Sequence, residues 1–226
     1  MISATVSQAN ISLGVKCIYL AVVEGVSQHR VNQKNLELIR KEAHQKALAL
    51  DESFGSHRLL VGHRELLGKL GYSKRKARPA PERLIHICKK RGFPQILPAV
   101  DAYNSVVVED LVGVGAHDAD KIEGPIRFDI AAGGEAFLPL LKDNPIRLRA
   151  GDYFYRDSKR ILGRLACEDC DETKVTKHTK RILLVSEGNP NSSKEEVRNI
   201  VEKSCQRIVD CCGGSYTIWA PVVTSE

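Results

Sequence analysis

Residues 180–212 read KRILLVSEGNPNSSKEEVRNIVEKSCQRIVDCC, and this stretch indicates a strand followed directly by a helix. Lys180 to Glu187 contains the unbroken apolar run Ile182 to Val185, which is typical of a strand buried on both faces. Ser192 and Ser193 each stand three residues before a glutamate, as in two overlapping capping boxes at a helix start. The helix then shows one apolar stripe that ends before Gly213-Gly214, formed by Val197, Ile200, Val201, Ile208 and Cys212.

The first 97 residues predict a mostly helical, basic part of the chain. Residues 15–26 are rich in apolar and β-branched residues and predict one strand. Helical spacing of apolar residues predicts helices over 35–50 and 57–70. Pro79 and Pro81 interrupt this pattern, and another helix is expected over 82–91.

Residues 98–226 predict a sheet-rich part. A helix is expected over 101–111, and a last short strand over 216–223. Between them, short apolar runs alternate with Gly, Pro and Asp, as in short strands of an antiparallel or mixed sheet. These runs are PIRFDIAA, EAFLPLL, PIRLRAGDYFY and RILGRLA. The two parts together indicate an α+β fold, which we interpret as one domain over residues 1–226.

The composition is that of an ordinary globular protein. The chain has 226 residues, of which 42% are hydrophobic and 27% charged. It contains no run of the ~20 apolar residues that span a bilayer, and its first residues do not form a secretory leader, so we expect a cytoplasmic protein without a membrane partner. Its seven cysteines are odd in number and form no regular framework, and without an export signal we expect them to be reduced thiols rather than disulfides.

The positive charge is concentrated in one segment. Between Arg58 and Arg91 there are eleven Lys and Arg against Glu65 and Glu82, whereas the rest of the chain has a net charge of −3. Such a distribution favours a surface that meets a polyanion. The alternative is a solvated helix face, which is the usual meaning of a run of charges.

Two segments place polar groups among apolar neighbours. If residues 101–111 are helical, Asp101 and Asn104 share one face. Gly113 and Gly115 then permit a tight loop that presents His117 and Asp118. The second segment runs from a hydroxyl-rich loop around Thr173 into the buried strand that finishes at Glu187. A carboxylate there binds an ammonium group or serves as a structural cap.

Three ordered motifs resemble a known family: PxVDxYN at 98–104, GAHDxDKIxGxIxxxxAxxGExFxPL at 115–140 and TKVTxxTKxxLLVxEG at 173–188. They are similar to the editing domain of the phenylalanyl-tRNA synthetase β subunit, and more closely to its free-standing relatives. The similarity covers roughly residues 58–213. It implies a layered β-sandwich-like core with flanking helices.

The resemblance also implies an activity. The synthetase module hydrolyses the ester that joins a wrongly attached tyrosine to tRNA, without a metal. This chain is thus expected to be a trans-acting aminoacyl-tRNA deacylase with tRNA as its partner and no cofactor. The alternative is a non-catalytic tRNA- or RNA-binding module. The motif that shapes tyrosine specificity in the family is absent, since CCGGSY stands at 211–216.

The motifs assign expected roles to particular residues. Asn104, His117 and Glu187 are the expected catalytic residues, with Glu187 or Asp101 facing the α-ammonium group of the substrate. His117 is a candidate for positioning water, since the imidazole pKa is ordinarily near 6.5, although a structural histidine is equally compatible. The expected substrate-binding residues are Asp101, Gly115, Asp118 and Thr173. The expected tRNA-binding residues are Lys74, Arg75, Lys76, Lys89, Lys90 and Arg91.

Cys167 and Cys170 form a Cys-x-x-Cys pair just before the threonine-rich loop. Such a pair could hold zinc together with Cys211, Cys212 or His178. A single pair without a second one of matching spacing is a weak signal, however. We therefore expect two ordinary thiols and no metal site.

Overall fold

The computed structural model describes residues 2–15, 17–73 and 78–224, which form an α+β fold. One sheet has six strands in the order β12 (Val222–Thr224), β1 (Ala4–Ser7), β4 (Ile126–Ile130), β7 (Tyr153–Arg156), β8 (Ile161–Arg164) and β9 (Glu168–Asp169). A second has four strands in the order β11 (Ser215–Trp219), β2 (Ile18–Glu24), β10 (Arg181–Glu187) and β3 (Gly115–Asp118). The short strands β5 (Ala136–Phe137) and β6 (Ile146–Arg147) pair with each other.

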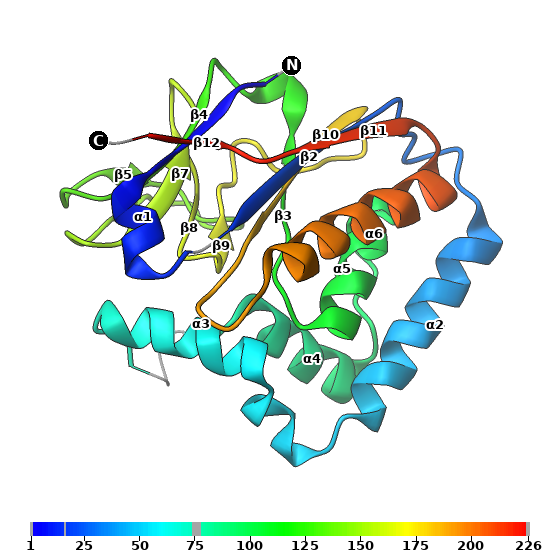
Figure 1. Cartoon of the computed structure of the whole chain (residues 1–226). Helices are drawn as coiled ribbons and strands as arrows, with labels where there is room; N and C mark the ends of the chain where they lie inside the picture. The colour runs from blue at the N-terminus through cyan, green and yellow to red at the C-terminus, as the bar shows by residue number, and fades with distance from the viewer. Residues whose placement is uncertain (1, 16, 74–77, 225–226) are drawn as a thin grey trace.

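The helices lie mainly on one side of the four-stranded sheet (Figure 1). They are α1 (Gln8–Leu13), α2 (Gln33–Ala49), α3 (Arg58–Lys69), α4 (Ala80–Arg91), α5 (Pro98–Asp110) and α6 (Lys194–Cys212). Two short 3-10 helices, η1 (Glu52–Ser56) and η2 (Ala119–Lys121), complete the set in the described residues. The N-terminal part contributes β1 to one sheet and β2 to the other, so both sheets join segments that are distant in sequence.

Strand β10 shows how the layers are built. Its side chains alternate between two apolar clusters, because successive residues of a strand point to opposite faces. Leu183 and Val185 pack between the two sheets. Ile182 and Leu184 pack on the opposite face, in the cluster that contains residues of α2, α5 and α6. The four-stranded sheet is thus the middle layer between the six-stranded sheet and the helices.

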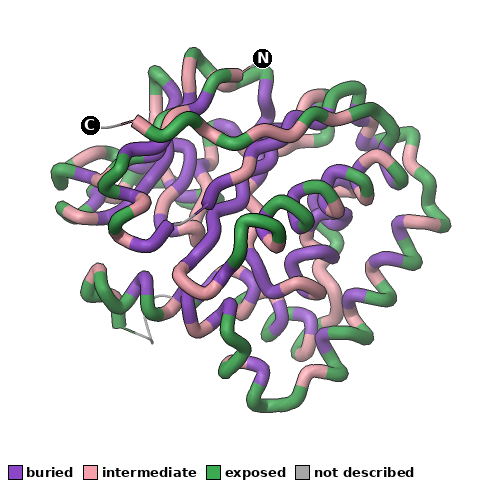
Figure 2. Tube along the Cα trace, in the orientation of Figure 1, coloured by how far each residue is buried: buried purple, intermediate pink, exposed green. Residues whose placement is uncertain are grey.

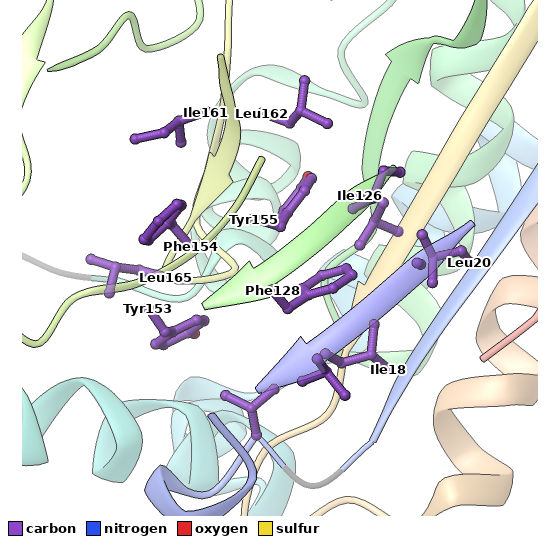
Figure 3. Close-up of a cluster of buried hydrophobic side chains, with 14 of the residues drawn as sticks. Ile18, Leu20, Ile126, Phe128, Tyr153, Phe154, Tyr155, Ile161, Leu162 and Leu165 are labelled. Carbon is purple, nitrogen blue, oxygen red and sulfur yellow. The ribbon is translucent and has the colours of Figure 1, made fainter. Parts of the chain in front are cut away.

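The core between the sheets is buried, as the purple colour of the central part of the chain in Figure 2 shows. Ile18 and Leu20 of β2 lie near Ile126 and Phe128 of β4 (Figure 3), and all four belong to the same buried cluster. Burial of this kind of side chain is worth about 1.5–3 kcal/mol each, so the two sheets are held together mainly by the hydrophobic effect.

Most of the predicted elements are confirmed with shifts of a few residues at their ends. The strand predicted over 15–26 is β2, the helices predicted over 35–50, 57–70 and 101–111 are α2, α3 and α5, and the buried strand is β10. The capping box of α6 is also present, since the Ser193 hydroxyl accepts from the Glu196 N–H at 3.1 Å and the Glu196 carboxylate accepts from the Ser193 N–H at 2.8 Å.

Four details of the sequence-based expectation were wrong. Gly115 to Asp118 is not a loop but strand β3, paired with β10. Residues 216–223 do not form one strand, because the chain leaves the four-stranded sheet after Trp219 and joins the six-stranded sheet at Val222. Helix α4 begins at Ala80, since Pro81 falls in the first turn, where no intrahelical N–H is needed. The Ser192 hydroxyl accepts from the Asn189 N–H and donates to the Asn189 carbonyl oxygen, so it does not form a second capping box.

Candidate functional site

A cleft opens where the end of β10 meets the turn between β8 and β9. Its interior volume is about 50 Å³, and about 370 Å³ when the space at its open mouth is included. Both sheets contribute to it, and the start of α4 forms part of its edge. The lining residues are Ala80, Gly113, Val114, Gly115, Tyr155, Arg164, Ala166, Cys167, Glu168, Asp169, Val185 and Glu187.

Glu187 enters the cleft from the last position of β10. It lies on the same face of that strand as Val185, two residues earlier, and both line the cleft. Strand β3 pairs with β10 up to Val185, opposite Gly115. Burial, reinforced by the negative charge of Asp169, raises the pKa of Glu187 to about 8. This carboxyl group is therefore protonated at neutral pH unless a cation binds beside it.

Asp169 enters the same cleft from β9, on the other sheet. Its carboxylate accepts the Ala116 N–H at 3.3 Å and the Tyr155 hydroxyl at 3.2 Å. Burial raises the pKa of Asp169 above its ordinary value, and the nearby His117 and these two hydrogen bonds offset only part of that rise. A β-carbon on Gly115 would come within 2.7 Å of Asp169 Oδ1, so only glycine at this position allows the close approach.

A chain of hydrogen bonds runs from Asp169 into the protein interior. His117 Nε2 lies 2.7 Å from the Tyr155 hydroxyl, and His117 Nδ1 lies 2.8 Å from the Thr173 hydroxyl. Cys170 Sγ lies 2.9 Å from the same Thr173 oxygen. Since Tyr155 donates to Asp169, the pattern is satisfied if His117 donates from Nε2 to Tyr155 and accepts from Thr173 at Nδ1.

His117 is a buried member of this chain and does not line the cleft. It is fully buried, and burial lowers its pKa, so the imidazole is neutral at physiological pH. Tyr155 separates it from the cleft and packs edge-on against it, with ring centroids 5.6 Å apart. A β-carbon on Gly163, opposite Tyr155 in the sheet, would lie 2.5 Å from the Tyr155 ring. His117 thus positions Tyr155, and through it Asp169.

Cys167 forms another part of the cleft wall. Its Sγ lies 3.3 Å from His63 Nε2 and 3.7 Å from the Arg78 carbonyl oxygen. Burial raises the pKa of the Cys167 thiol to about 12 and lowers the pKa of His63 to about 4, so both groups are neutral. A neutral thiol is a poor nucleophile, and Cys167 serves here as a wall of the cleft.

The structure does not bring all predicted site residues together. Gly115 and Glu187 line the cleft, and Thr173 lies behind it, bonded to His117. Asp118 is buried and accepts the Thr179 hydroxyl at 2.8 Å, away from the cleft lining. Asp101 is fully buried and accepts from Arg40 Nε at 2.9 Å and from the Ile96 N–H at 2.8 Å.

Asn104 is partly exposed on α5 and is likewise absent from the cleft lining. Asp101 and Asn104 were predicted to share one helix face at the site, but neither residue lines this cleft. Their predicted roles in substrate binding and catalysis stay predictions.

The two cysteines of the Cys-x-x-Cys pair have separate surroundings. Cys170 is buried and bonded to Thr173, whereas Cys167 contacts His63. Across residues 2–15, 17–73 and 78–224, no group of three or more His, Cys, Asp or Glu side chains is arranged to hold a metal ion.

Basic side chains lie near the mouth of the cleft and on α4. The Arg83 guanidinium donates to the Cys167 carbonyl oxygen, directly behind the cleft wall, and Arg78 is exposed next to it. Lys90 and Arg91 are exposed at the end of α4. Lys89 is half-buried, contacting the Leu50 carbonyl oxygen and lying 5.4 Å from the Phe54 ring centroid. The predicted tRNA-binding residues Lys74, Arg75 and Lys76 lie outside the described residues.

Tyr155 and Asp169 are the site residues that sequence reasoning missed. Asp169 lies inside the Cys167-Glu-Asp-Cys170 run, which was considered only as a possible metal site because of its two cysteines. Tyr155 stood inside a predicted strand without any local motif. The signal that was available is the acidic pair Glu168-Asp169 next to a predicted hydroxyl-rich loop, which indicates a polar turn at the edge of a sheet.

Comparisons with known proteins agree with this architecture. The family model described as the B3/4 domain matches residues 62–211. The structure is similar to an N-terminal fragment of the phenylalanyl-tRNA synthetase β subunit from Pyrococcus horikoshii, with a TM-score of 0.53 and 16% sequence identity over 100% of this chain and 52% of that chain. The chain thus spans about half the length of that fragment.

A comparison with curated protein sequences finds no match. No helix within the described residues is both long enough and apolar enough to cross a bilayer. The family model covers all the residues that line the cleft and those of the hydrogen-bond chain behind it. The chain therefore belongs to the B3/4 domain family.

Proposed function

We propose that this protein is an aminoacyl-tRNA deacylase that hydrolyses the ester of mischarged tRNA. The observation that supports this most is the meeting of two carboxyl groups, Asp169 and Glu187, in one small cleft. An aminoacyl ester carries an α-ammonium group next to its reacting carbonyl, and a carboxylate is the natural partner of that cation. The B3/4 family match adds a link to synthetase editing regions.

The two carboxyl groups have different roles in this proposal. Asp169, held by the Ala116 N–H and the Tyr155 hydroxyl, is the ionised group that binds the α-ammonium. Glu187 has its pKa raised to about 8 and changes its protonation state near working pH. The pKa values of Asp169 and Glu187 are both raised, and the negative charge of Asp169 raises that of Glu187 further, so in this proposal one carboxyl group is ionised and the other is protonated in the free cleft.

Glu187 acts as the general base for hydrolysis. The bound ammonium group lowers the pKa of Glu187, since an adjacent positive charge favours the ionised form. The carboxylate takes a proton from water as the water oxygen bonds to the ester carbonyl carbon. The bond between that carbon and the ribose oxygen then breaks, and the proton passes to the ribose oxygen. Because an aminoacyl ester is already activated, this positioning of water supplies much of the needed acceleration.

The basic side chains outside the cleft would bind the tRNA backbone. Arg78 and Arg83 lie beside the cleft wall at Cys167, where the phosphates next to the terminal adenosine would pass. Lys90 and Arg91 extend the positive surface along α4. Phosphate contacts of this type give affinity without sequence specificity.

A deacylation screen tests the proposal. One tRNA transcript is charged in separate reactions with each of several amino acids, and release of the amino acid is followed with wild-type protein, with Glu187→Gln and with buffer alone. Hydrolysis of at least one ester above the buffer rate, lost in Glu187→Gln, is the expected result. Binding of the charged tRNA without hydrolysis of any ester would contradict the proposal and identify a binding module.

A further inference from the structure

The walls of the cleft leave little space beside the two carboxyl groups. The interior volume is about 50 Å³. A cavity that holds a benzene ring has a volume of about 150 Å³. The enclosed part of the cleft therefore has room for a few non-hydrogen atoms, and a phenyl or phenol ring does not fit within this part unless its walls move apart.

One wall is held by the pairing of two central strands. Val185 of β10 lies opposite Gly115 of β3, and both line the cleft. Strand β10 is paired on both sides, with β3 and β2, and Val185 is 2% exposed. Movement of Val185 away from the cleft would break the packing between the two sheets, so this wall is fixed.

Another wall of the cleft is a tight turn with an unusual backbone. Leu165 and Ala166 connect β8 to β9 with φ angles of 57° and 46°, although neither is glycine. The Cys167 N–H donates to the Arg164 carbonyl oxygen at 3.1 Å, which closes the turn. The Leu165 side chain is buried in the core between the sheets and anchors the turn. Such strained conformations persist only where surrounding packing holds them.

Cys167 is fixed as firmly as Ala166. Its thiol contacts His63 and the Arg78 carbonyl oxygen, and its own carbonyl oxygen accepts from Arg83. The turn and the thiol thus line the same cleft as Val185, and hydrogen bonds and packing hold each of them in place.

We infer that the ester hydrolysed at this cleft carries an amino acid with a small side chain, of the size of alanine or serine, and that Val185 and Cys167 set this limit. The inference rests on the proposed deacylase function. Aromatic amino acids such as tyrosine and phenylalanine are excluded by size, although their α-ammonium group is the same.

The experiment compares esters that differ only in the amino acid. One tRNA transcript is charged with alanine, serine, phenylalanine or tyrosine, so recognition of the tRNA is constant. Single-turnover deacylation by wild-type protein is expected to be at least about 10-fold faster for alanine and serine, since steric exclusion in a rigid pocket is at least as strong as the loss of one methylene contact.

A variant that widens the cleft tests the assigned residues. Val185→Ala is expected to accelerate the hydrolysis of the aromatic esters. The ratio of the alanine and serine rates to the phenylalanine and tyrosine rates should therefore be smaller than in wild-type protein. The matched control is Val23→Ala, the same change in neighbouring strand β2 at a residue that packs against the helices. It should leave the ratio unchanged. Thermal unfolding of both variants shows whether each one folds.

The possible results test the size limit and the proposed deacylase function separately. Faster hydrolysis of the aromatic esters than of the alanine and serine esters by wild-type protein would overturn the size limit and leave the deacylase function standing. An equal ratio in wild-type and Val185→Ala would overturn the assignment to Val185. Hydrolysis of no ester from the wider screen would contradict the proposed function itself.

Discussion

Glu187 and Asp169 bring one carboxyl group from each of the two large sheets to the same cleft. Glu187 ends β10 of the four-stranded sheet, and Asp169 ends β9 of the six-stranded sheet. The negative charge of Asp169 adds to burial in raising the pKa of Glu187 to about 8. The stacking of the sheets thus creates the electrostatic coupling on which the proposed chemistry depends.

This coupling predicts a pH-dependent stability. The folded protein keeps the proton of Glu187 up to pH about 8, whereas the unfolded chain releases it near pH 4.3. Between these values, the unfolding free energy falls by up to about 1.4 kcal/mol per pH unit as pH rises. Glu187→Gln cannot ionise and should be the more stable protein at pH 8, with the difference disappearing near pH 4. Urea titrations at several pH values measure it, and a constant difference would contradict the raised pKa.

The hydrogen bond between Tyr155 and Asp169 predicts a separable effect on activity. Tyr155→Phe removes the link between His117 and Asp169 and leaves His117 Nε2 without its partner. We expect a loss of about 1–3 kcal/mol of stability from the unpaired group and a fall in deacylation of about 10-fold or more. The measurements are urea unfolding and single-turnover deacylation.

Tyr153→Phe is the matched control for that variant. Tyr153 lies two residues earlier in β7 and is also buried, but its hydroxyl has no hydrogen-bond partner in the part of the chain that the structure describes. Its removal should therefore be neutral or stabilising, with unchanged turnover. Equal losses in Tyr155→Phe and Tyr153→Phe would show that the Tyr155 hydroxyl has no special role.

The basic surface predicts a salt-dependent affinity for tRNA. Replacing Lys74, Arg75 and Lys76 together by alanine should weaken binding and reduce the slope of log affinity against log salt by about 2 to 3, since each phosphate contact releases counterions. A triple alanine variant of Lys34, Lys41 and Lys46, exposed on α2, is the control with the same change of charge. Equal slopes in the two variants would show that the run at 74–76 is only a solvated surface.

A substitution of Asn104 tests whether the sequence motif or the cleft marks the catalytic site. The motif predicts a catalytic role for Asn104, whereas the structure places it outside the cleft lining. If the cleft is the site, Asn104→Ala should change single-turnover deacylation by less than about 3-fold, because a substitution away from the reacting groups has a small effect. A loss of about 10²-fold with intact tRNA affinity would return the site to α5.

Local pattern predicted much of the fold but only part of the site. The apolar periodicity of α2, α3 and α5, the unbroken apolar run of β10 and the Ser193–Glu196 capping box are all visible in short windows of sequence. The passage of the chain from the four-stranded to the six-stranded sheet after Trp219 is not visible in such windows. It depends on which edge strand is free to pair with Val222. Tertiary pairing decides such strands, and local propensity does not.

The same distinction applies to the site. Glu187 was predicted because it ends a recognisable buried strand. The contact of Asp169 with Tyr155 and with the Ala116 N–H joins residues that are 14 and 53 positions apart. The surroundings of Asp101 were not visible in the sequence for a related reason, since the Arg40 side chain that engages it comes from α2, 61 positions earlier. Long-range pairing of this kind leaves no periodic signal in the sequence.

The most direct test of the proposed chemistry is the single-turnover rate of deacylation by wild-type protein and by Glu187→Gln, measured from pH 6 to pH 9 beside a tRNA-binding titration. The wild-type rate, corrected for spontaneous hydrolysis, should rise with pH and level off below pH 8, because the bound ammonium group lowers the pKa of Glu187 from its value of about 8 in the free protein. Glu187→Gln should lose about 10²-fold or more and the pH-dependent rise, with tRNA affinity nearly unchanged. Full activity of Glu187→Gln at pH 8, with the wild-type pH profile, would contradict the account.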